Sequence, residues 1–169
     1  MQKLSWLLGV LLLMLGVSAW AQEAPQAELF GGYSYVHSNF ANVGLNSNGG
    51  SASLAVNPNP WFGVVADFGG YHGSNLTTVT YLFGPRFSYR SKSPFTPFAQ
   101  VLFGGAHASG SSNAFAMSVG GGLDLRADSQ WSWRIVQAEY LLTNFNDGSS
   151  GHQHNARIST GVVYRWGGK

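Results

Sequence analysis

The sequence predicts an all-β protein that forms a closed, antiparallel, eight-stranded transmembrane β-barrel. Apolar residues alternate with polar or small ones at a period of two along most of the chain, which indicates strands rather than helices. Only 9% of the 169 residues are charged, against about 25% in an average soluble domain, whereas 14% are aromatic. Because so few charges could not cover the outer faces of eight strands in water, we expect those faces to contact lipid.

The first 21 residues have the organisation of a secretory signal peptide. Lys3 supplies a positive charge, an apolar run rich in leucine extends from Leu4 to Val17, and Ala19 and Ala21 place small residues where signal peptidase reads them. The apolar run is shorter than the ~20 residues that a membrane-spanning helix needs. We therefore expect cleavage immediately before Gln22.

The mature chain, residues 22–169, is expected to form one barrel domain. It contains no cysteine, so an exported protein of this kind must be stabilised by packing or by the membrane rather than by disulfides. No helical segment separates the alternating ones, which excludes a parallel sheet with crossover helices. The eight predicted strands are residues 27–38, 49–57, 61–72, 76–89, 95–107, 113–126, 131–142 and 155–166.

The connecting segments alternate in character and predict two different rims. Short connectors rich in turn residues would form one end of the barrel, the turn rim, and they are residues 57–60, 90–94 and 127–130. Polar segments rich in Ser, Gly and Asn would form the opposite end, the loop rim, and they are residues 38–48, 73–75, 108–112 and 143–154. Except for the short segment 73–75, these are the longer connectors, and such a contrast is typical of outer-membrane barrels.

Ionisable and polar residues in the middle of the strands predict which faces point inward. An arginine or lysine that faces lipid at the bilayer midplane costs about 2–4 kcal/mol, so these side chains should point into the barrel. The aromatic and aliphatic residues between them are then left facing outward. The predicted interior network consists of Asp67, Arg86, Gln100, Asp124, Glu139 and Arg157.

Arg134 does not fit this assignment. If Glu139 points inward, strict alternation turns Arg134 outward, and we expect its side chain to reach the interface near the turn rim, where Glu28 also lies. An eight-stranded barrel has room for little besides its own side chains, and buried charges must pair. The interior network is therefore expected to form a salt-bridged plug rather than a path for protons or ions.

The end of the chain carries a pattern of polar, glycine and aromatic residues. Ser159, Gly161, Tyr164 and Trp166 fit polar-x-Gly-x-x-aromatic-x-aromatic. This pattern resembles the assembly signal that the outer-membrane insertion machinery reads in the last strand. Its physical basis suits strand addition, in which an edge is paired while alternate side chains fill pockets.

Residues 27–166 resemble the small eight-stranded outer-membrane barrels of the OmpA type, in the outer-membrane protein β-barrel domain family. The most family-like stretches are "LFGGYSYVHSN" near the start, "QAEYLLTNF" in the seventh strand and "GVVYRW" at the end. The resemblance implies a bacterial outer-membrane location, contact with the lipid bilayer, assembly by the insertion machinery and a monomeric barrel. No peptidoglycan-binding domain follows in this sequence, so we expect a barrel alone.

The residues that could carry chemistry predict no catalytic, cofactor or metal site. All five histidines fall toward the loop rim, where polar residues at a wet rim explain them better than a metal centre without cysteines and with few carboxylates. They are His37, His72, His107, His152 and His154. The segment His72-Gly73-Ser74-Asn75 matches by letters an element of the lipid A deacylases, but no suitable Glu follows nearby to support an activated hydroxyl.

We therefore expect a non-enzymatic envelope protein with a structural role or a role in surface interactions through its loops. A narrow ion or small-solute channel is the alternative, and a lipid A-modifying enzyme is a more remote one. A net charge of +2 without a basic cluster argues against a nucleic-acid partner. The predicted loops contain no lysine or arginine that could clamp lipopolysaccharide phosphates, and the sequence identifies no surface partner.

Overall fold

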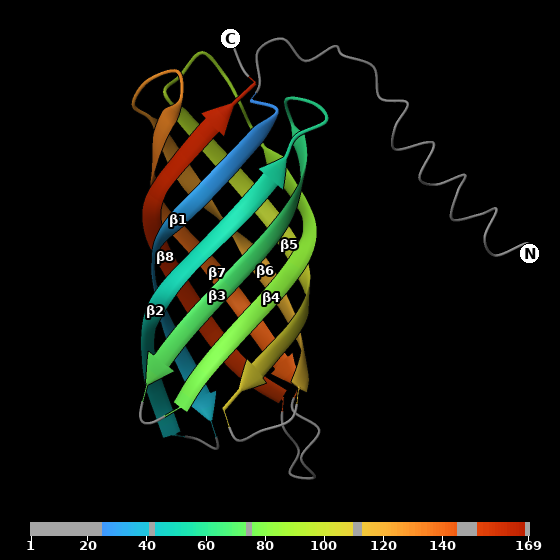
Figure 1. Cartoon of the computed structure of the whole chain (residues 1–169), viewed down its shortest axis with the longest axis vertical. Coiled ribbons are helices and arrows are strands. Elements are labelled where there is room, and N and C mark those ends of the chain that lie inside the picture. Colours follow the sequence, from blue (N-terminus) through green and yellow to red (C-terminus); the bar gives the residue numbers. More distant parts are fainter. Residues whose placement is uncertain (1–24, 41–42, 74–75, 110–112, 145–151, 168–169) are drawn as a thin grey trace, which may run out of the picture.

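The computed structural model of the chain is a closed barrel of eight antiparallel strands, in which each strand pairs with the next and the last pairs with the first (Figure 1). The structure describes residues 25–40, 43–73, 76–109, 113–144 and 152–167. The strands are β1 (Ala27–Phe40), β2 (Val43–Val56), β3 (Phe62–Gly73), β4 (Leu76–Ser88), β5 (Phe95–Ala108), β6 (Asn113–Arg126), β7 (Trp131–Asn144) and β8 (His152–Trp166). The predicted fold class is confirmed.

Within the described ranges, no helix is both long and apolar enough to cross a membrane. The predicted signal-peptide cleavage site, Ala19 to Gln22, lies outside these ranges and stays a prediction.

The turn rim is the end of the barrel where β1 begins and β8 ends, at the top of Figure 1. Side-chain oxygens organise its connectors. Asp128 Oδ1 accepts hydrogen bonds from the backbone N–H groups of Gln130 and Trp131, both at 2.7 Å. Asn59 Oδ1 accepts one from the N–H of Phe62 at 2.8 Å. These are the local bonds that make Asp and Asn strong turn formers.

The contrast in loop length is not as predicted. The connectors at the loop rim are residues 41–42, 74–75, 109–112 and 145–151, so three of the four are no longer than the shortest connector at the turn rim, residues 127–130. The largest difference is in β2, which begins at Val43 instead of residue 49. Ladder pairing continues through this polar stretch, for example between His37 and Asn46. Backbone hydrogen bonds need no apolar alternation, and the alternation was the only signal available in the sequence.

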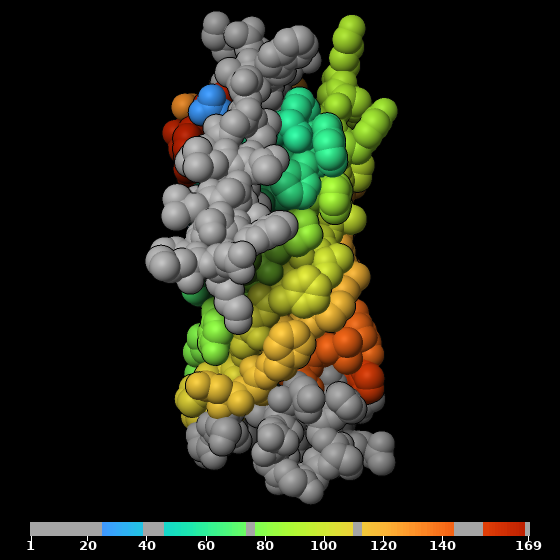
Figure 2. All heavy atoms as spheres, turned by 90° about the vertical axis from the view of Figure 1, so that its right-hand side faces the viewer, coloured from blue at the N-terminus to red at the C-terminus, as the bar shows by residue number. Residues whose placement is uncertain are grey.

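The outer surface is aromatic and aliphatic, as predicted. Figure 2 shows side chains of β4 to β6 covering one side of it closely. Phe83, in the middle of β4, has 62% of its surface exposed, and the outward facing assigned to β3, β4, β6 and β8 is confirmed throughout. Representative outward residues are Tyr33, Phe68, Tyr81, Phe83, Phe115, Val119, Ile158 and Val162.

Aromatic side chains also gather near the turn rim, where they contact one another. Trp61 stacks on Phe87 with ring centroids 6.1 Å apart, and Trp131 meets the edge of Tyr164 at 4.9 Å. Tyr164 in turn lies 5.9 Å from Trp166. Such girdles are found where a barrel crosses from hydrocarbon to headgroups.

The outward position expected for Arg134 is wrong. Its side chain is fully buried inside the barrel, while Ile135 and Val136 are both exposed, each at 41%. The ladder to β6 pairs Asp124 with Arg134 and the adjacent Leu123 with Val136, so Ile135 is an extra residue. A β-bulge of this kind places two consecutive side chains on one face and inverts the alternation beyond it. Glu139 and Arg134 therefore both point inward although five residues separate them.

Because Phe83 faces lipid, the free-energy cost of placing a charge there should depend on its depth in the bilayer. Phe83→Arg should destabilise the folded barrel by about 2–4 kcal/mol, because it places a cation near the bilayer midplane. Tyr89→Arg is the matched control, since Tyr89 is also exposed but lies at the turn rim, where the cost should be about 0–1 kcal/mol. Urea unfolding in lipid vesicles measures both values. Equal destabilisation would contradict the assigned depth of β4.

The bulge predicts that β7 tolerates loss of one residue at one place only. Deleting Ile135 removes the extra residue and leaves Arg134, Gln137 and Glu139 on the inner face, so the barrel should fold with a loss of about 1–3 kcal/mol. Deleting Ala138, in the regular part of the strand, moves one end of β7 to the opposite face and should abolish folding. Migration of unheated samples in detergent gels measures the folded fraction. A folded Ala138 deletion with an unfolded Ile135 deletion would refute the bulge.

Candidate functional site

The interior of the barrel is a charge-balanced polar network. Among the described residues, four carboxylates and four arginines are buried, so their formal charges cancel. The three largest fully buried side chains are themselves arginines, Arg86, Arg134 and Arg157. The eight groups are Glu28, Asp67, Asp124, Glu139, Arg86, Arg134, Arg157 and Arg165.

Arg157 of β8 connects three strands. It stands directly opposite Glu139 of β7 in the ladder, and its Nε donates to Glu139 Oε2 at 2.6 Å. Its Nη1 reaches across to β3, where it donates to Asp67 Oδ1 at 2.7 Å and to the Tyr71 hydroxyl at 2.8 Å. One guanidinium thus bonds two carboxylates from different strands, a use for which its five planar donors are suited.

Glu139 is the acceptor on which the middle of the network converges. Its Oε1 accepts from Gln100 Nε2 at 2.8 Å and from Ser118 Oγ at 2.9 Å, and its Oε2 accepts from Gln137 Nε2 at 2.8 Å. With Arg157, the carboxylate therefore receives donors from β5, β6, β7 and β8. A buried carboxylate is tolerated when its lone pairs are satisfied in this way.

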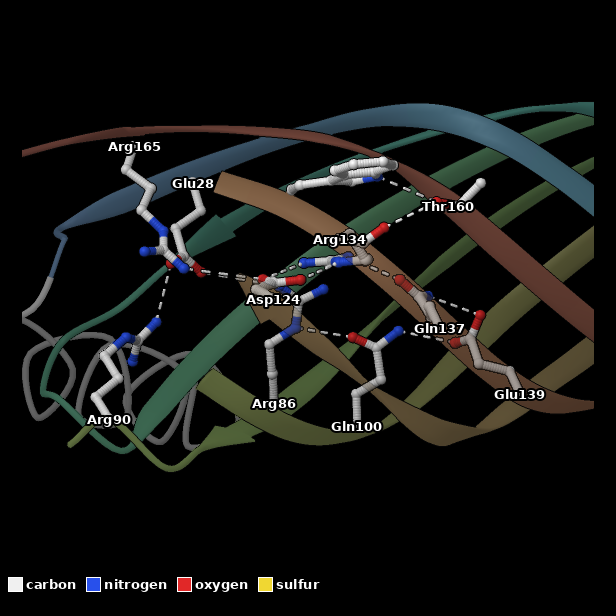
Figure 3. A network of polar contacts seen from close by, with 11 residues as sticks. Glu28, Arg86, Arg90, Gln100, Asp124, Arg134, Gln137, Glu139, Thr160 and Arg165 are labelled. Atoms are coloured by element: carbon white, nitrogen blue, oxygen red, sulfur yellow. Dashed lines mark hydrogen bonds and ion pairs between the residues drawn. The ribbon is translucent and has the colours of Figure 1, made fainter. Parts of the chain in front are cut away.

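Gln100 and Gln137 extend the hydrogen-bond network from Glu139 toward the turn rim (Figure 3). Gln100 Oε1 accepts from Arg86 Nε at 2.9 Å, and the two residues are ladder partners on β5 and β4. Gln137 Oε1 accepts from Arg134 Nη1 at 2.7 Å. Each glutamine amide thus accepts a hydrogen bond from an arginine and donates one to Glu139. These two bonds fix the orientation of the amide group.

Arg134 is held by a carboxylate and by two aromatic rings. It binds Asp124 with two hydrogen bonds, from Nε to Oδ1 at 2.8 Å and from Nη2 to Oδ2 at 3.0 Å. The guanidinium carbon lies 4.4 Å from the ring centroids of both Phe30 and Phe98. Phe98 also lies 4.5 Å from the guanidinium of Arg86. Stacking on rings suits the flat faces of arginine, which carry no hydrogen-bond donors.

Inward-facing glycines make room for these rings. A Cβ added to Gly161 would lie 2.9 Å from Phe30 Cε2, and one added to Gly122 would lie 2.7 Å from Phe98 Cζ. At these two positions the nearest side-chain atoms belong to the phenylalanines on which Arg134 stacks.

A second cluster, centred on Glu28, lies at the turn-rim end of the network (Figure 3). Its Oε1 is 3.1 Å from Arg90 Nη2 and 3.2 Å from Arg165 Nε, and its Oε2 is 3.9 Å from Arg86 Nη1. Arg90 also donates to the carbonyl of Pro60 at 2.5 Å. Three cations around one carboxylate tie β1, β4, β8 and the β4–β5 connector together.

The structure brings the six residues of the predicted network into one connected interior set. Arg86, Gln100, Glu139, Arg157 and Asp67 form a continuous chain of contacts. Asp124 joins this chain through Arg134 and Gln137.

Sequence reasoning missed six side chains that bond within the interior: Glu28, Tyr71, Ser118, Arg134, Gln137 and Arg165. Four of them follow from the predicted network, because Tyr71, Ser118, Gln137 and Arg165 each lie an even number of residues from a predicted inward residue of the same strand. Glu28 lies in β1, where the predicted network had no residue, and Arg134 lies beyond the bulge.

The residues of the predicted assembly signal fall on both faces of β8. Ser159 is buried and bonded to Ser34 Oγ at 2.7 Å, and Gly161 stands opposite Gly32. Tyr164 and Trp166 lie on the outer face in the aromatic girdle. Recognition of this pattern by the insertion machinery stays a prediction.

The predicted loop-rim histidines do not converge. His37, His72, His107 and His154 are exposed on the outer face of four different strands, and the described part of the chain contains no group of three side chains that could hold a metal ion. The side chain of His152 lies outside the described part. Of the deacylase-like letters, Ser74 and Asn75 also lie outside it, and His72 Nδ1 is bonded to Thr77 Oγ1 at 3.0 Å.

A family model for the outer membrane protein beta-barrel domain matches residues 7–165. The chain belongs to this family. It is therefore a protein of the bacterial outer membrane, embedded as a barrel in the bilayer. No curated protein matches the chain in sequence.

Solved structures of outer-membrane barrels share the fold at low sequence identity. Neisserial surface protein A (NspA) superposes with a TM-score of 0.69 at 10% identity, over 83% of this chain and 97% of that one. OprG from Pseudomonas aeruginosa gives 0.60 at 8% identity, over 88% and 99%. Ail, the attachment invasion locus protein of Yersinia pestis, gives 0.57 at 15% identity, over 85% and 99%.

The paired carboxylate and guanidinium of Asp124 and Arg134 predict strong coupling in this outer-membrane barrel. Arg134→Gln alone should destabilise it by about 3–5 kcal/mol, because Asp124 is left buried without its two donors. Adding Asp124→Asn removes that orphaned charge and should recover much of the loss. Urea unfolding of both single variants and the double variant completes the thermodynamic cycle. Strictly additive effects would show that the pair does not act as a unit.

Proposed function

We propose that this barrel is a non-enzymatic component of the cell envelope that acts as a monomer with a closed interior. Its role is structural, or it presents its loop rim to a partner at the cell surface. The observation that carries the proposal is the interior itself, where charged side chains from opposite walls of the barrel bind one another. Arg157 of β8, for example, reaches Asp67 of β3.

Two physical arguments favour a plug over a channel. An eight-stranded barrel has an interior just wide enough to be filled by side chains. Here the filling is a cross-braced set in which Glu139 alone receives donors from four strands. An ion could pass only after several of these charge-assisted bonds had broken, and a buried charge left without its partner costs about 3–5 kcal/mol.

An enzymatic role receives no support from the described side chains. A hydroxyl nucleophile needs a base within hydrogen-bond reach and a third group that orients the base. His72 bonds Thr77, but the acidic side chains of this region, Asp67 and Glu139, point into the barrel and are engaged by Arg157. The outer surface of β3 and β4 therefore supplies a histidine and a hydroxyl without an orienting carboxylate.

Assembly by the outer-membrane insertion machinery is part of the proposal. The closing strand β8 presents Tyr164 and Trp166 outward, with Ser159 and Gly161 on the opposite face, which suits strand addition with alternate side chains in pockets. Gly167 follows with a φ of 77°, a left-handed conformation that favours glycine. The regular strand thus stops directly after the last aromatic residue.

Single-channel recording tests the closed interior. The folded barrel in planar bilayers should give no discrete conductance steps, with a cold-gel mobility shift establishing that the same sample is folded. The paired variant Glu139→Ala/Arg157→Ala removes two opposite charges from the middle of the network, so it keeps the interior neutral and should conduct more than the parent. Steps of equal size in parent and variant would favour the channel.

A further inference from the structure

Among the described side chains, each of the four hairpins that meet at the loop rim carries one outward-facing histidine, bonded to a polar side chain of its partner strand. On the first three hairpins the two residues are directly opposite in the ladder. The pairs are His37 with Asn46, His72 with Thr77, His107 with Asn113, and His154 with Tyr140. The first three bonds measure 2.8, 3.0 and 3.0 Å. We call these four histidines the histidine belt.

The belt lies just beyond the apolar outer surface. On β5, His107 lies twelve positions after the outward Phe95, which is at the turn rim. At ~3.3 Å per residue and a tilt of ~40°, this spans about 30 Å along the barrel axis. The apolar band of outer-membrane barrels is ~25 Å tall. With the aromatic girdle at one interface, the belt is level with lipid headgroups at the other.

Among the described side chains of the loop rim, the basic ones are the four histidines of the belt. Every lysine and arginine in the described ranges either points into the barrel or lies at the turn rim, as Arg90, Lys92 and Arg126 do. Histidine is the side chain whose charge ordinarily changes between pH 5 and 8. The loop rim is therefore uncharged in its described part when the histidines are neutral, and cationic around the barrel when they are protonated.

The bonding partners are compatible with both states. All four contacts use Nδ1, and an Asn carbonyl oxygen, a Thr hydroxyl or a Tyr hydroxyl can each accept a proton from it. A protonated ring can thus keep its partner through Nδ1–H and present Nε2–H to a second acceptor. Each bond through Nδ1 fixes the orientation of the imidazole ring and leaves Nε2 available to a ligand.

The described side chains that face the belt from neighbouring strands include no carboxylate, amine or guanidinium. They are Asn46 and Asn48 on β2, Thr77 and Val79 on β4, Asn113 on β6, Tyr140 and Leu142 on β7, Ala156 on β8, and Tyr33 and Tyr35 on β1. Among the described side chains, the charged groups nearest in the chain, Asp67, Glu139 and Arg157, point to the inner face and pair there. No described carboxylate is therefore placed to neutralise a protonated belt.

We propose that the histidine belt binds the phosphate groups of anionic lipids at the loop-rim surface of the membrane, and that it does so when acidification protonates it. The ligand is a lipid headgroup because the belt follows the circumference of the barrel at headgroup depth. Its four members lie on β1, β3, β5 and β8 and therefore face surrounding lipid rather than one common centre. This activity is independent of whether the interior conducts ions.

Electron paramagnetic resonance of spin-labelled lipids tests the proposal. The barrel is reconstituted in phosphatidylcholine vesicles with a trace of spin-labelled phosphatidylglycerol, or of spin-labelled phosphatidylcholine as the reference headgroup. Both headgroups keep their charge between pH 8 and pH 5. The association of phosphatidylglycerol relative to phosphatidylcholine should rise about two- to fivefold on acidification, the effect of about one cation near an anionic lipid.

Two variants assign the rise to the belt. In His37→Gln/His72→Gln/His107→Gln/His154→Gln most of the rise in relative association on acidification should be lost. In Lys92→Gln/Arg126→Gln the relative association should be lower at both pH values but should still rise on acidification, because this variant removes exposed cations of the turn rim and leaves the belt intact. A cold-gel shift establishes that each variant is folded. If the fourfold variant does not fold, His37→Gln/His154→Gln and His72→Gln/His107→Gln replace it, and each should lose about half of the rise.

Three results would overturn the proposal. They are an unchanged relative association in the parent barrel, a full rise in the histidine variants, and an equal rise for both headgroups.

Discussion

Every charge that points into this barrel in the described part of the chain is paired with an opposite charge from another strand, and the other features of the interior follow from that requirement. The outer surface must be apolar to contact lipid, so each charged residue in the middle of a strand is directed inward. Charges inside so narrow a space cannot be left unpaired. Arg157 meets this condition with carboxylates on β7 and β3, and Arg134 meets it with a carboxylate on β6. The network therefore braces the wall as well as filling it.

Neutralising Arg134 required a change in the backbone. In a regular strand it would share the face of Tyr140 and lie in lipid. The extra residue at Ile135 turns it inward, where Asp124 is its direct ladder partner. The two phenylalanines that stack on it need space in turn, which Gly161 and Gly122 provide on β8 and β6. One bulge, one ion pair, two rings and two glycines thus form a single packing unit that spans several strands.

The sequence predicted the features that depend on the alternation of apolar and polar residues along a strand. It failed where a bulge interrupts that alternation or where a polar strand lacks it. Asp67, Arg86, Asp124 and Arg157 each set the phase of their strand correctly, because the cost of exposing them to lipid exceeds any local preference. The bulge at Ile135 shows in the sequence only as the odd spacing of Arg134 and Glu139, which does not indicate which residue between them is extra. The extension of β2 to Val43 depends on backbone bonds between polar residues, which have no hydrophobic period. The partners of each arginine depend on strand curvature, and composition does not encode it.

The inner network and the histidine belt show opposite uses of polar side chains in one barrel. Inside, Arg157 and Glu139 are buried and bound to each other, so titrating either of them would leave a charge without compensation. Outside, His37 and His107 are exposed and bonded through one nitrogen to a neutral amide, so protonation breaks nothing and leaves Nε2 available. A change of pH in the range where histidine titrates would therefore alter the surface that meets the headgroups while the plug that holds the barrel together stays intact.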